Sequence, residues 1–301
     1  MAWVPLADGQ SLFVRVIGRG KPVLMLPGLG MNSRQWLPFV LPFSHRFRFY
    51  MPDFRGHGRS RLVTLANQGD VFQSHADDVK QVIEYFGLDD YLLAGISLGA
   101  TTAMHLERDG ALAGARRYLH IDQSPCVLNQ PDWTHGLCGV SQPALHERMA
   151  QLEQFLNLYP EADYVDQLPA DSRQQLVTLF DAMSETLGVG GGARWALQNL
   201  LPVAPAWLLR RLPLMRLSDM RAYLNGYLRA GHDYRPTLGS AGLPVTLMPG
   251  ANSALYALAG QQCVADAAPE SEVVVFERSG HVPLVDEPLK FLREFGRFLK
   301  A

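Results

Sequence analysis

The spacing of hydrophobic residues changes several times along the 301-residue chain, and each change predicts a different element. Hydrophobic and polar residues alternate over residues 3–6 and 11–17, on either side of an Asp8-Gly9 turn, which predicts a β-hairpin. Residues 22–26 form a short run without a polar side chain, as expected for a strand that is buried on both faces. The chain therefore begins with strands of two kinds, one half-exposed and one fully buried.

Hydrophobic residues three and four positions apart predict two amphipathic helices. The first is expected to begin at Ser74, with Asp77 in the place of the acid of a capping box, and to end at Gly87. The second is expected to begin at Pro288, because proline favours the first position of a helix. Further strands are expected at 46–51, 91–94, 117–121, 245–248 and 272–276, and a further helix at 254–267.

The alternation of strands and helices predicts the architecture of the chain. It is typical of an α/β fold whose mostly parallel sheet is covered by helices on both faces. Between residues 124 and 238 the strand patterns stop and helical patterns dominate. We therefore expect a core formed by residues 1–123 and 239–301, with residues 124–238 inserted as a helical cap.

A G-x-S-x-G sequence at residues 95–99 lies between a predicted strand and a predicted helix. Such a turn pushes the hydroxyl of Ser97 out of the sheet, and small neighbours are needed because strand and helix approach closely there. In this context the pattern favours a nucleophilic serine over an ordinary glycine-rich turn.

A serine hydroxyl needs a base, and His281 is the best placed of the nine histidines. It lies in a loop after the last predicted strand, and in an open α/β sheet the carboxyl ends of the strands meet at one edge. His57, in a G-H-G turn, and His120, inside a strand, are weaker candidates. Asp122 follows the strand next along the chain from that of Ser97, so its carboxylate can orient the imidazole. Its alternative role is a turn or cap before Pro125.

An oxyanion needs fixed N–H donors, and two backbone groups are candidates. The N–H of Leu98 qualifies because Leu98 directly follows the nucleophile, and the N–H of Leu29 because it lies in the loop after the strand at 22–26. Gly28 in the same loop is expected to border the bound substrate.

Four segments together give the chain a resemblance to the α/β-hydrolase superfamily. They are L-P-G-L-G at 26–30, P-D-F-R-G-H-G-R-S at 52–60, the serine turn and Gly280-His281. The resemblance covers nearly the whole chain and implies a serine hydrolase, with the second segment in a structural role. Two departures stand out: Pro27 replaces a histidine often found before the oxyanion glycine, and Ser253 stands where the usual acid would be. The resemblance also implies that the acid can lie on the earlier strand, as Asp122 does.

The predicted cap is expected to choose the substrate. Trp195, Trp207 and Met215 are candidates for an apolar binding pocket, although packing within the cap explains them equally well. Residues 194–229 contain six arginines and one acid. This basic stretch suits an anionic acyl carrier, a carboxylate or a membrane surface, and a plain solvated face explains it as well.

Composition narrows the possible functions further. The net charge of −2 gives no reason to expect nucleic acid, and the three cysteines form no C-x-x-C pattern. Neither a metal nor another cofactor is expected. The N-terminal residues lack the charged start and continuous apolar core of a signal peptide, and no apolar run is long enough to cross a membrane. We therefore expect a cytoplasmic protein.

We expect an esterase that cleaves a small-molecule ester with an apolar acyl or alcohol part through an acyl-enzyme. Three alternatives use the same fold. They are a thioesterase or carrier-linked acyl esterase, a cofactor-free dioxygenase that uses His281 and Asp122 as a base pair, and a ligand receptor without catalytic activity.

Overall fold

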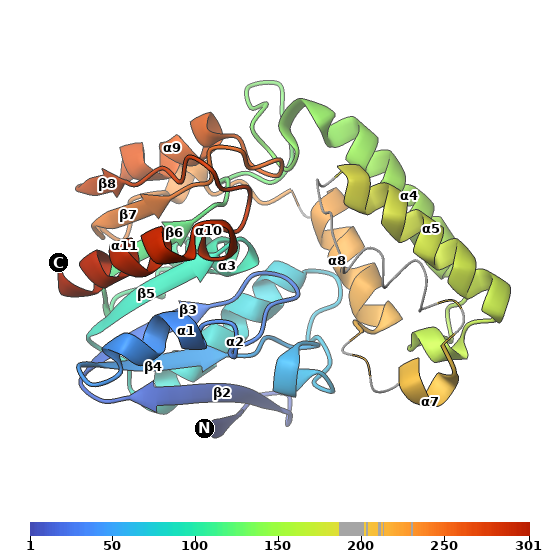
Figure 1. The fold of residues 1–301 in the computed structure, drawn as a ribbon, viewed down its shortest axis with the longest axis horizontal. Helices are drawn as coiled ribbons and strands as arrows, with labels where there is room; N and C mark the ends of the chain where they lie inside the picture. Colours follow the sequence, from blue (N-terminus) through green and yellow to red (C-terminus); the bar gives the residue numbers. More distant parts are fainter. Residues whose placement is uncertain (187–201, 203, 210–211, 213, 230) are drawn as a thin grey trace.

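One sheet of eight strands organises the part of the chain that the computed structural model describes, which is residues 1–186, 202, 204–209, 212, 214–229 and 231–301 (Figure 1). The strand order is β1-β2-β4-β3-β5-β6-β7-β8. The first two pairings, β1 with β2 and β2 with β4, are antiparallel, and all the others are parallel. The bounds are β1 Ala2–Pro5, β2 Ser11–Gly18, β3 Lys21–Leu26, β4 Phe47–Pro52, β5 Tyr91–Ile96, β6 Ala115–Ile121, β7 Val245–Met248 and β8 Ser271–Val273. The predicted α/β fold with a mostly parallel sheet is confirmed.

Helices cover both faces of the sheet. α1 (Leu37–Val40) and α11 (Pro288–Lys300) pack on one face, while α2 (Val71–Phe86) and α3 (Leu98–Arg108) pack on the other. The remaining helices near the sheet are α9 (Leu258–Ala267) and α10 (Pro283–Asp286). Both faces of the central strands are therefore buried, which explains why residues 22–26 carry no polar side chain.

A second group of helices lies beyond one end of the sheet, at the right of Figure 1. It consists of α4 (Gln142–Asn157), α5 (Ala170–Thr186), α7 (Ala206–Leu209) and α8 (Leu217–Arg229). These helices enclose a hydrophobic cluster of their own, which includes Leu145, Phe155, Leu176 and Leu224. All of them come from the segment between β6 and β7, so the chain leaves the sheet once and returns to it once. The division at residues 123/124 and 238/239 remains a prediction.

Three predicted boundaries are wrong by three or four residues. α2 begins at Val71 because the Asp70 carboxylate already accepts hydrogen bonds from the N–H groups of the first turn, which leaves Ser74 inside the helix. Gly87 does end α2, in the left-handed conformation. The helix expected at 254–267 begins only at Leu258, and before it the Tyr256 N–H bonds to the Ser253 side chain. β8 is shorter than predicted because regular pairing ends at Val273, and a single bridge, Gly250 to Phe276, continues it.

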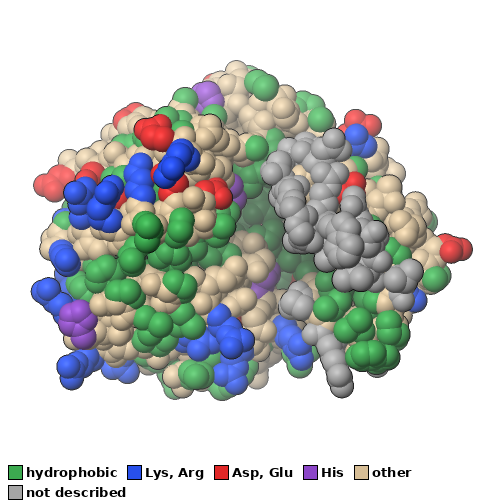
Figure 2. All heavy atoms as spheres, viewed as in Figure 1, with side chains coloured by type: hydrophobic (Ala, Val, Ile, Leu, Met, Phe, Trp, Pro, Cys, Tyr) green, Lys and Arg blue, Asp and Glu red, His purple; other side chains and the backbone are tan. Residues whose placement is uncertain are grey.

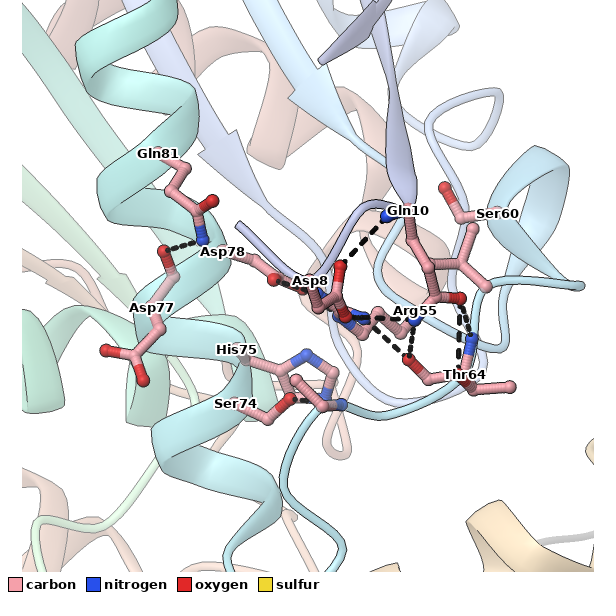
Figure 3. Close-up of polar contacts among 12 residues, drawn as sticks. Asp8, Gln10, Arg55, Ser60, Thr64, Ser74, His75, Asp77, Asp78 and Gln81 are labelled. Carbon is pink, nitrogen blue, oxygen red and sulfur yellow. Dashed lines mark hydrogen bonds and ion pairs between the residues drawn. The ribbon is translucent and has the colours of Figure 1, made fainter. Parts of the chain in front are cut away.

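The segment after β4 is held by a buried arginine (Figure 3). The Arg55 guanidinium donates two hydrogen bonds of 2.7 Å to Asp78 on α2, and it also donates to Asp8 in the first hairpin turn and to the Thr64 carbonyl. Its side chain is only 1% exposed. A planar guanidinium pairs with a carboxylate through two parallel bonds, so this contact fixes the direction of both groups. Arg55 therefore joins three distant segments, in keeping with the structural role expected for 52–60.

Within the described part of the chain, no helix is both long enough and apolar enough to cross a membrane. Cys126 and Cys138 are buried, and Cys263 is partly exposed.

Candidate active site

Ser97 occupies a strained turn between β5 and α3. Its φ of +51° lies in the left-handed region, which non-glycine residues rarely adopt. A Cβ atom on Gly99 would lie 2.2 Å from the carbonyl oxygen of Leu26, and one on Gly95 would lie 2.6 Å from that of Gly99. Glycine is therefore required on both sides of the serine, which is the physical content of the G-x-S-x-G pattern.

Asp122 and His281 lie in contact although 159 residues separate them. Asp122 directly follows β6 and is completely buried, and His281 follows β8 with 19% of its side chain exposed. The Nδ1 atom of His281 lies 2.6 Å from Oδ2 of Asp122. An imidazole bonded in this way at Nδ1 keeps Nε2 free to exchange a proton.

Three further donors reach the Asp122 carboxylate. The Gly250 N–H donates to Oδ1 at 2.8 Å, Gln261 Nε2 donates to Oδ1 at 3.0 Å, and Ser253 Oγ donates to Oδ2 at 2.7 Å. Sequence reasoning named Ser253 only as the residue that replaces the usual acid, and it missed Gln261. A glutamine on the buried side of α9, next to Val264 and Ala265, was the signal that could have found it.

Ser97 and His281 both line one cavity of about 460 Å³. Its remaining walls are almost entirely apolar and come mainly from α4, α5 and α8 and from the loop that ends at Tyr256. Figure 2 shows hydrophobic side chains in the hollow between the sheet and these helices. Apolar walls and a few polar groups at one end are typical of a small-molecule site.

The two backbone groups predicted to bind an oxyanion border the same region. Leu98 is the first residue of α3, so its N–H has no acceptor within the helix. Leu29 is 40% exposed and lines the cavity, and a Cβ atom on Gly28 would lie 3.4 Å from Cβ of Ser97. The loop at 27–30 therefore passes directly beside the serine.

The predicted cap residues have different locations. Met215 lines the cavity, as does Met220. Trp207 on the short helix α7 is 61% exposed and is not part of the cavity wall, whereas Leu209 of the same helix is buried. Trp195 lies outside the described residues. Sequence reasoning missed three tyrosines of the wall, namely Tyr223, Tyr227 and Tyr256.

The arginines of the basic stretch are less available to a binding partner than the composition suggests. Arg216 is buried and pairs with Asp219, Arg221 donates to two backbone carbonyls, and Arg229 pairs with Glu153. These three arginines are thus used within the helical group. Arg194, Arg210 and Arg211 lie outside the described residues.

His57 and His120, the weaker candidates for the base, have internal partners instead. His57 Nδ1 bonds to the Arg55 carbonyl, and His120 bonds through both nitrogens to Tyr118 Oη and the Gln123 carbonyl. Burial lowers the pKa of His57 and lowers that of His120 to about 4. Neither histidine is part of the cavity wall. Among the described residues no group of three or more His, Cys, Asp or Glu side chains could hold a metal ion.

Comparison with known proteins gives matches over nearly the whole chain. A protein-family model described as "Alpha/beta hydrolase family" matches residues 23–294. A pimeloyl-[acyl-carrier protein] methyl ester esterase of Nitrosomonas europaea is 25% identical over 288 residues, which are 95% of this chain and 98% of that protein. The AB hydrolase superfamily protein YisY of Bacillus subtilis is 23% identical, over 96% of this chain and 98% of that protein.

Solved structures agree on the fold. An esterase from Exiguobacterium antarcticum superposes with a TM-score of 0.74 at 19% identity, covering 100% of this chain and 99% of the other. The family model spans both the serine turn and the loop of His281. The chain is therefore an enzyme of the alpha/beta hydrolase family.

Proposed function

We propose that Ser97, His281 and Asp122 form the catalytic triad with which this ester hydrolase cleaves a carboxylic ester. One observation carries the proposal: the serine at the strained turn and the histidine held by Asp122 line the same apolar cavity. A nucleophile, a base and an orienting carboxylate are the three groups that acyl transfer requires. We propose as well that residues 1–123 and 239–301 form the catalytic core and residues 124–238 the cap.

In the first half-reaction, Ser97 Oγ attacks the ester carbonyl carbon while His281 Nε2 takes the hydroxyl proton. The carbonyl oxygen becomes an oxyanion, for which the N–H groups of Leu29 and Leu98 are the proposed donors. When the intermediate collapses, the C–O bond to the alcohol breaks and His281 gives its proton to the departing oxygen. An acyl group then remains on Ser97.

In the second half-reaction, water attacks the acyl-enzyme and gives a proton to His281. Collapse of the second intermediate releases the carboxylic acid and returns the proton to Ser97. Throughout the cycle Asp122 accepts the Nδ1–H bond, which fixes the tautomer and stabilises the transient imidazolium. No cofactor is required for this sequence of steps.

The cavity walls favour a substrate with a sizeable apolar acyl or alcohol part. Wall residues such as Leu145, Met149 and Phe180 offer no hydrogen bonds, so the free energy of binding is expected to come from buried hydrocarbon. Met215 contributes to the same wall. The sequence alone leads us to propose further that the enzyme acts in the cytoplasm.

A panel of p-nitrophenyl esters with acyl chains of increasing length tests this function. We expect kcat/KM to rise with chain length until the cavity is full, and we expect a fluorophosphonate probe to label Ser97. Absence of both ester hydrolysis and labelling would contradict the proposal and favour a receptor. Oxygen uptake with an aromatic substrate would instead indicate the dioxygenase.

A second candidate is a carrier-linked acyl esterase, or a thioesterase that uses the same residues. It is favoured by the relatives named pimeloyl-[acyl-carrier protein] methyl ester esterase, two of which match 95% and 88% of this chain. The test compares one acyl methyl ester in its free form with the same ester on an acyl carrier protein. A kcat/KM advantage for the carrier-linked form that shrinks as salt is added would support this candidate. Equal values for the two forms would support a small-molecule ester.

A further inference from the structure

We propose that Ser253 and Gln261 are positioning residues that fix the Asp122 carboxylate toward His281. The inference deepens the proposed function and rests on it. It concerns two side chains that contact neither the ester nor the serine and act only through Asp122.

The backbone of Asp122 gives the first reason. Its φ of +43° lies in the left-handed region, where an aspartate is less stable than in an extended strand. A residue in this conformation at the end of β6 needs other contacts to hold it. The four hydrogen bonds that converge on its carboxylate supply them.

The distribution of these bonds gives the second reason. Oδ1 accepts from the Gly250 N–H and from Gln261, while Oδ2 accepts from Ser253 and from His281. With two donors on each oxygen, the carboxylate cannot rotate about its Cβ–Cγ bond without losing bonds. Its orientation toward the imidazole is therefore fixed before any substrate binds.

Ser253 and Gln261 are also joined to each other through one turn. Gln261 Nε2 donates to the Tyr256 carbonyl at 3.0 Å, and the Tyr256 N–H donates to Ser253 Oγ at 3.3 Å. The turn from 253 to 256 thus sets the positions of both donors. Because Tyr256 itself lines the cavity, the donor set is built into the cavity wall.

A buried polar atom argues against simple packing as the role of Gln261. Its Oε1 atom is buried and accepts no hydrogen bond from the described residues. An apolar side chain of similar shape would avoid this cost, so the amide is explained by what its Nε2 does at Asp122. A second argument concerns Ser253. It occupies the position where the family resemblance expects the acid, and its Oγ donates to Asp122, which follows the neighbouring strand β6.

The experiment compares Gln261→Met and Ser253→Ala with two controls. Methionine keeps the length of glutamine and removes its donor. Gln262→Met is the matched control, since Gln262 is the next residue of α9 and donates to Asp266 at the exposed surface. Ser253→Thr keeps the hydroxyl and serves as the conservative rescue. Thermal unfolding and circular dichroism are recorded for every variant.

Two readouts separate positioning from a structural role. The first is kcat and KM for a p-nitrophenyl ester across the pH range. We expect kcat to fall by about 10-fold to 100-fold in Gln261→Met and in Ser253→Ala at unchanged KM, because the carboxylate can then turn away from the imidazole that it orients. The acidic limb of kcat/KM should move to lower pH, because an imidazolium whose carboxylate has turned away loses its proton more easily. Gln262→Met and Ser253→Thr should match the wild type.

The second readout does not depend on activity. The Nδ1–H proton of His281, bonded at 2.6 Å to Asp122, is expected to give a low-field proton NMR resonance. It should shift or broaden in Gln261→Met and Ser253→Ala but not in Gln262→Met. If the wild type hydrolyses esters but both folded variants keep its kcat, pH profile and resonance, the inference is wrong and the proposed function stands. If the wild type hydrolyses no ester and the resonance still responds to both variants, the function is wrong while the positioning is supported.

Discussion

Two buried carboxylates show how differently this chain uses the same group. Asp78 on α2 accepts two bonds from Arg55, a permanent cation, and its side chain is 1% exposed. Asp122 after β6 is equally buried, but its ionisable partner is His281, which reaches the cavity. Both side chains of the Arg55–Asp78 pair are buried, whereas the Asp122–His281 pair ends in the Nε2 atom of His281, which can exchange a proton.

This difference distinguishes polar contacts that stabilise the fold from polar contacts that take part in the reaction. A guanidinium keeps its charge at any ordinary pH, so the pair of Arg55 and Asp78 can only hold segments together (Figure 3). An imidazole changes its charge near neutral pH, so a fixed carboxylate beside it can stabilise a transient cation. Removal of the first pair should cost stability, and removal of the second should cost rate.

Ser97→Ala is expected to remove nearly all ester hydrolysis. We expect kcat to fall by at least about 10³-fold with little change in the free energy of unfolding, since the substitution removes the nucleophile and little buried contact. Ester hydrolysis and urea unfolding are the measurements. Ser60→Ala is the control, because Ser60 Oγ accepts the Phe13 N–H in the structural segment, and it should cost about 1 kcal/mol of stability at unchanged kcat. Substantial turnover by Ser97→Ala would contradict the nucleophile assignment.

Arg55→Met tests the structural side of the comparison. It leaves Asp78 and Asp8 without their guanidinium partner, and an uncompensated buried charge costs about 3–5 kcal/mol. We expect urea unfolding to report that loss, while kcat of the folded fraction stays near the wild-type value. A stable Arg55→Met with a large loss of kcat would assign this segment to catalysis instead.

Acid should weaken the fold through buried neutral histidines. Burial lowers the pKa of His105 and of His120 to about 4, against 6.5 in the unfolded chain. Above pH 6.5 the histidines are neutral in both states, and as the pH falls from 6.5 toward 4 the unfolded chain takes up protons first. Stability should therefore fall in this window, on the order of 1–3 kcal/mol per histidine. Urea unfolding of His120→Gln should show a flatter pH dependence, and an unchanged slope would mean that His120 takes no part in it.

The smallest effect concerns the cavity. Met149→Trp on α4 should shorten the usable cavity and lower kcat/KM for long esters by about fourfold per excluded methylene, with short esters unaffected. Leu158→Trp is the control, because Leu158 is 68% exposed and is not part of the wall. The p-nitrophenyl ester panel measures both variants, and an identical loss on short and long esters would point to damage at the triad.

Much of the fold was predictable because its signals are local. Fully apolar strands and Gly87 at a helix end can be recognised from neighbouring residues. The glycines beside Ser97 also form a short sequence pattern, although Gly99 is required by the carbonyl of Leu26 on β3. The proposed site was predictable to the extent that strand ends meet at one edge. That rule, together with the family resemblance, led to His281 and Asp122, which the structure brings into contact.

What escaped prediction depends on side-chain direction and on long-range contacts. Gln261 reaches Asp122 across 139 residues, and no local pattern states which face of a helix meets a strand end. Trp207 was a candidate for the pocket, but it is 61% exposed and does not line the cavity. The start of α2 was misplaced because Asp70 and Ser74 are both good caps and only the preceding backbone decides between them.

The central claim is that Asp122 serves the reaction and Asp78 serves the fold. Asp122→Asn and Asp78→Asn, measured side by side for kcat and for the free energy of unfolding, test it most directly. We expect Asp122→Asn to lose about 10⁴-fold in kcat near neutral pH, as in triads of the same logic, and to keep most of its stability. Asp78→Asn should lose about 3–5 kcal/mol of stability and keep its kcat when folded. Near wild-type turnover by a folded Asp122→Asn would contradict the account at its centre.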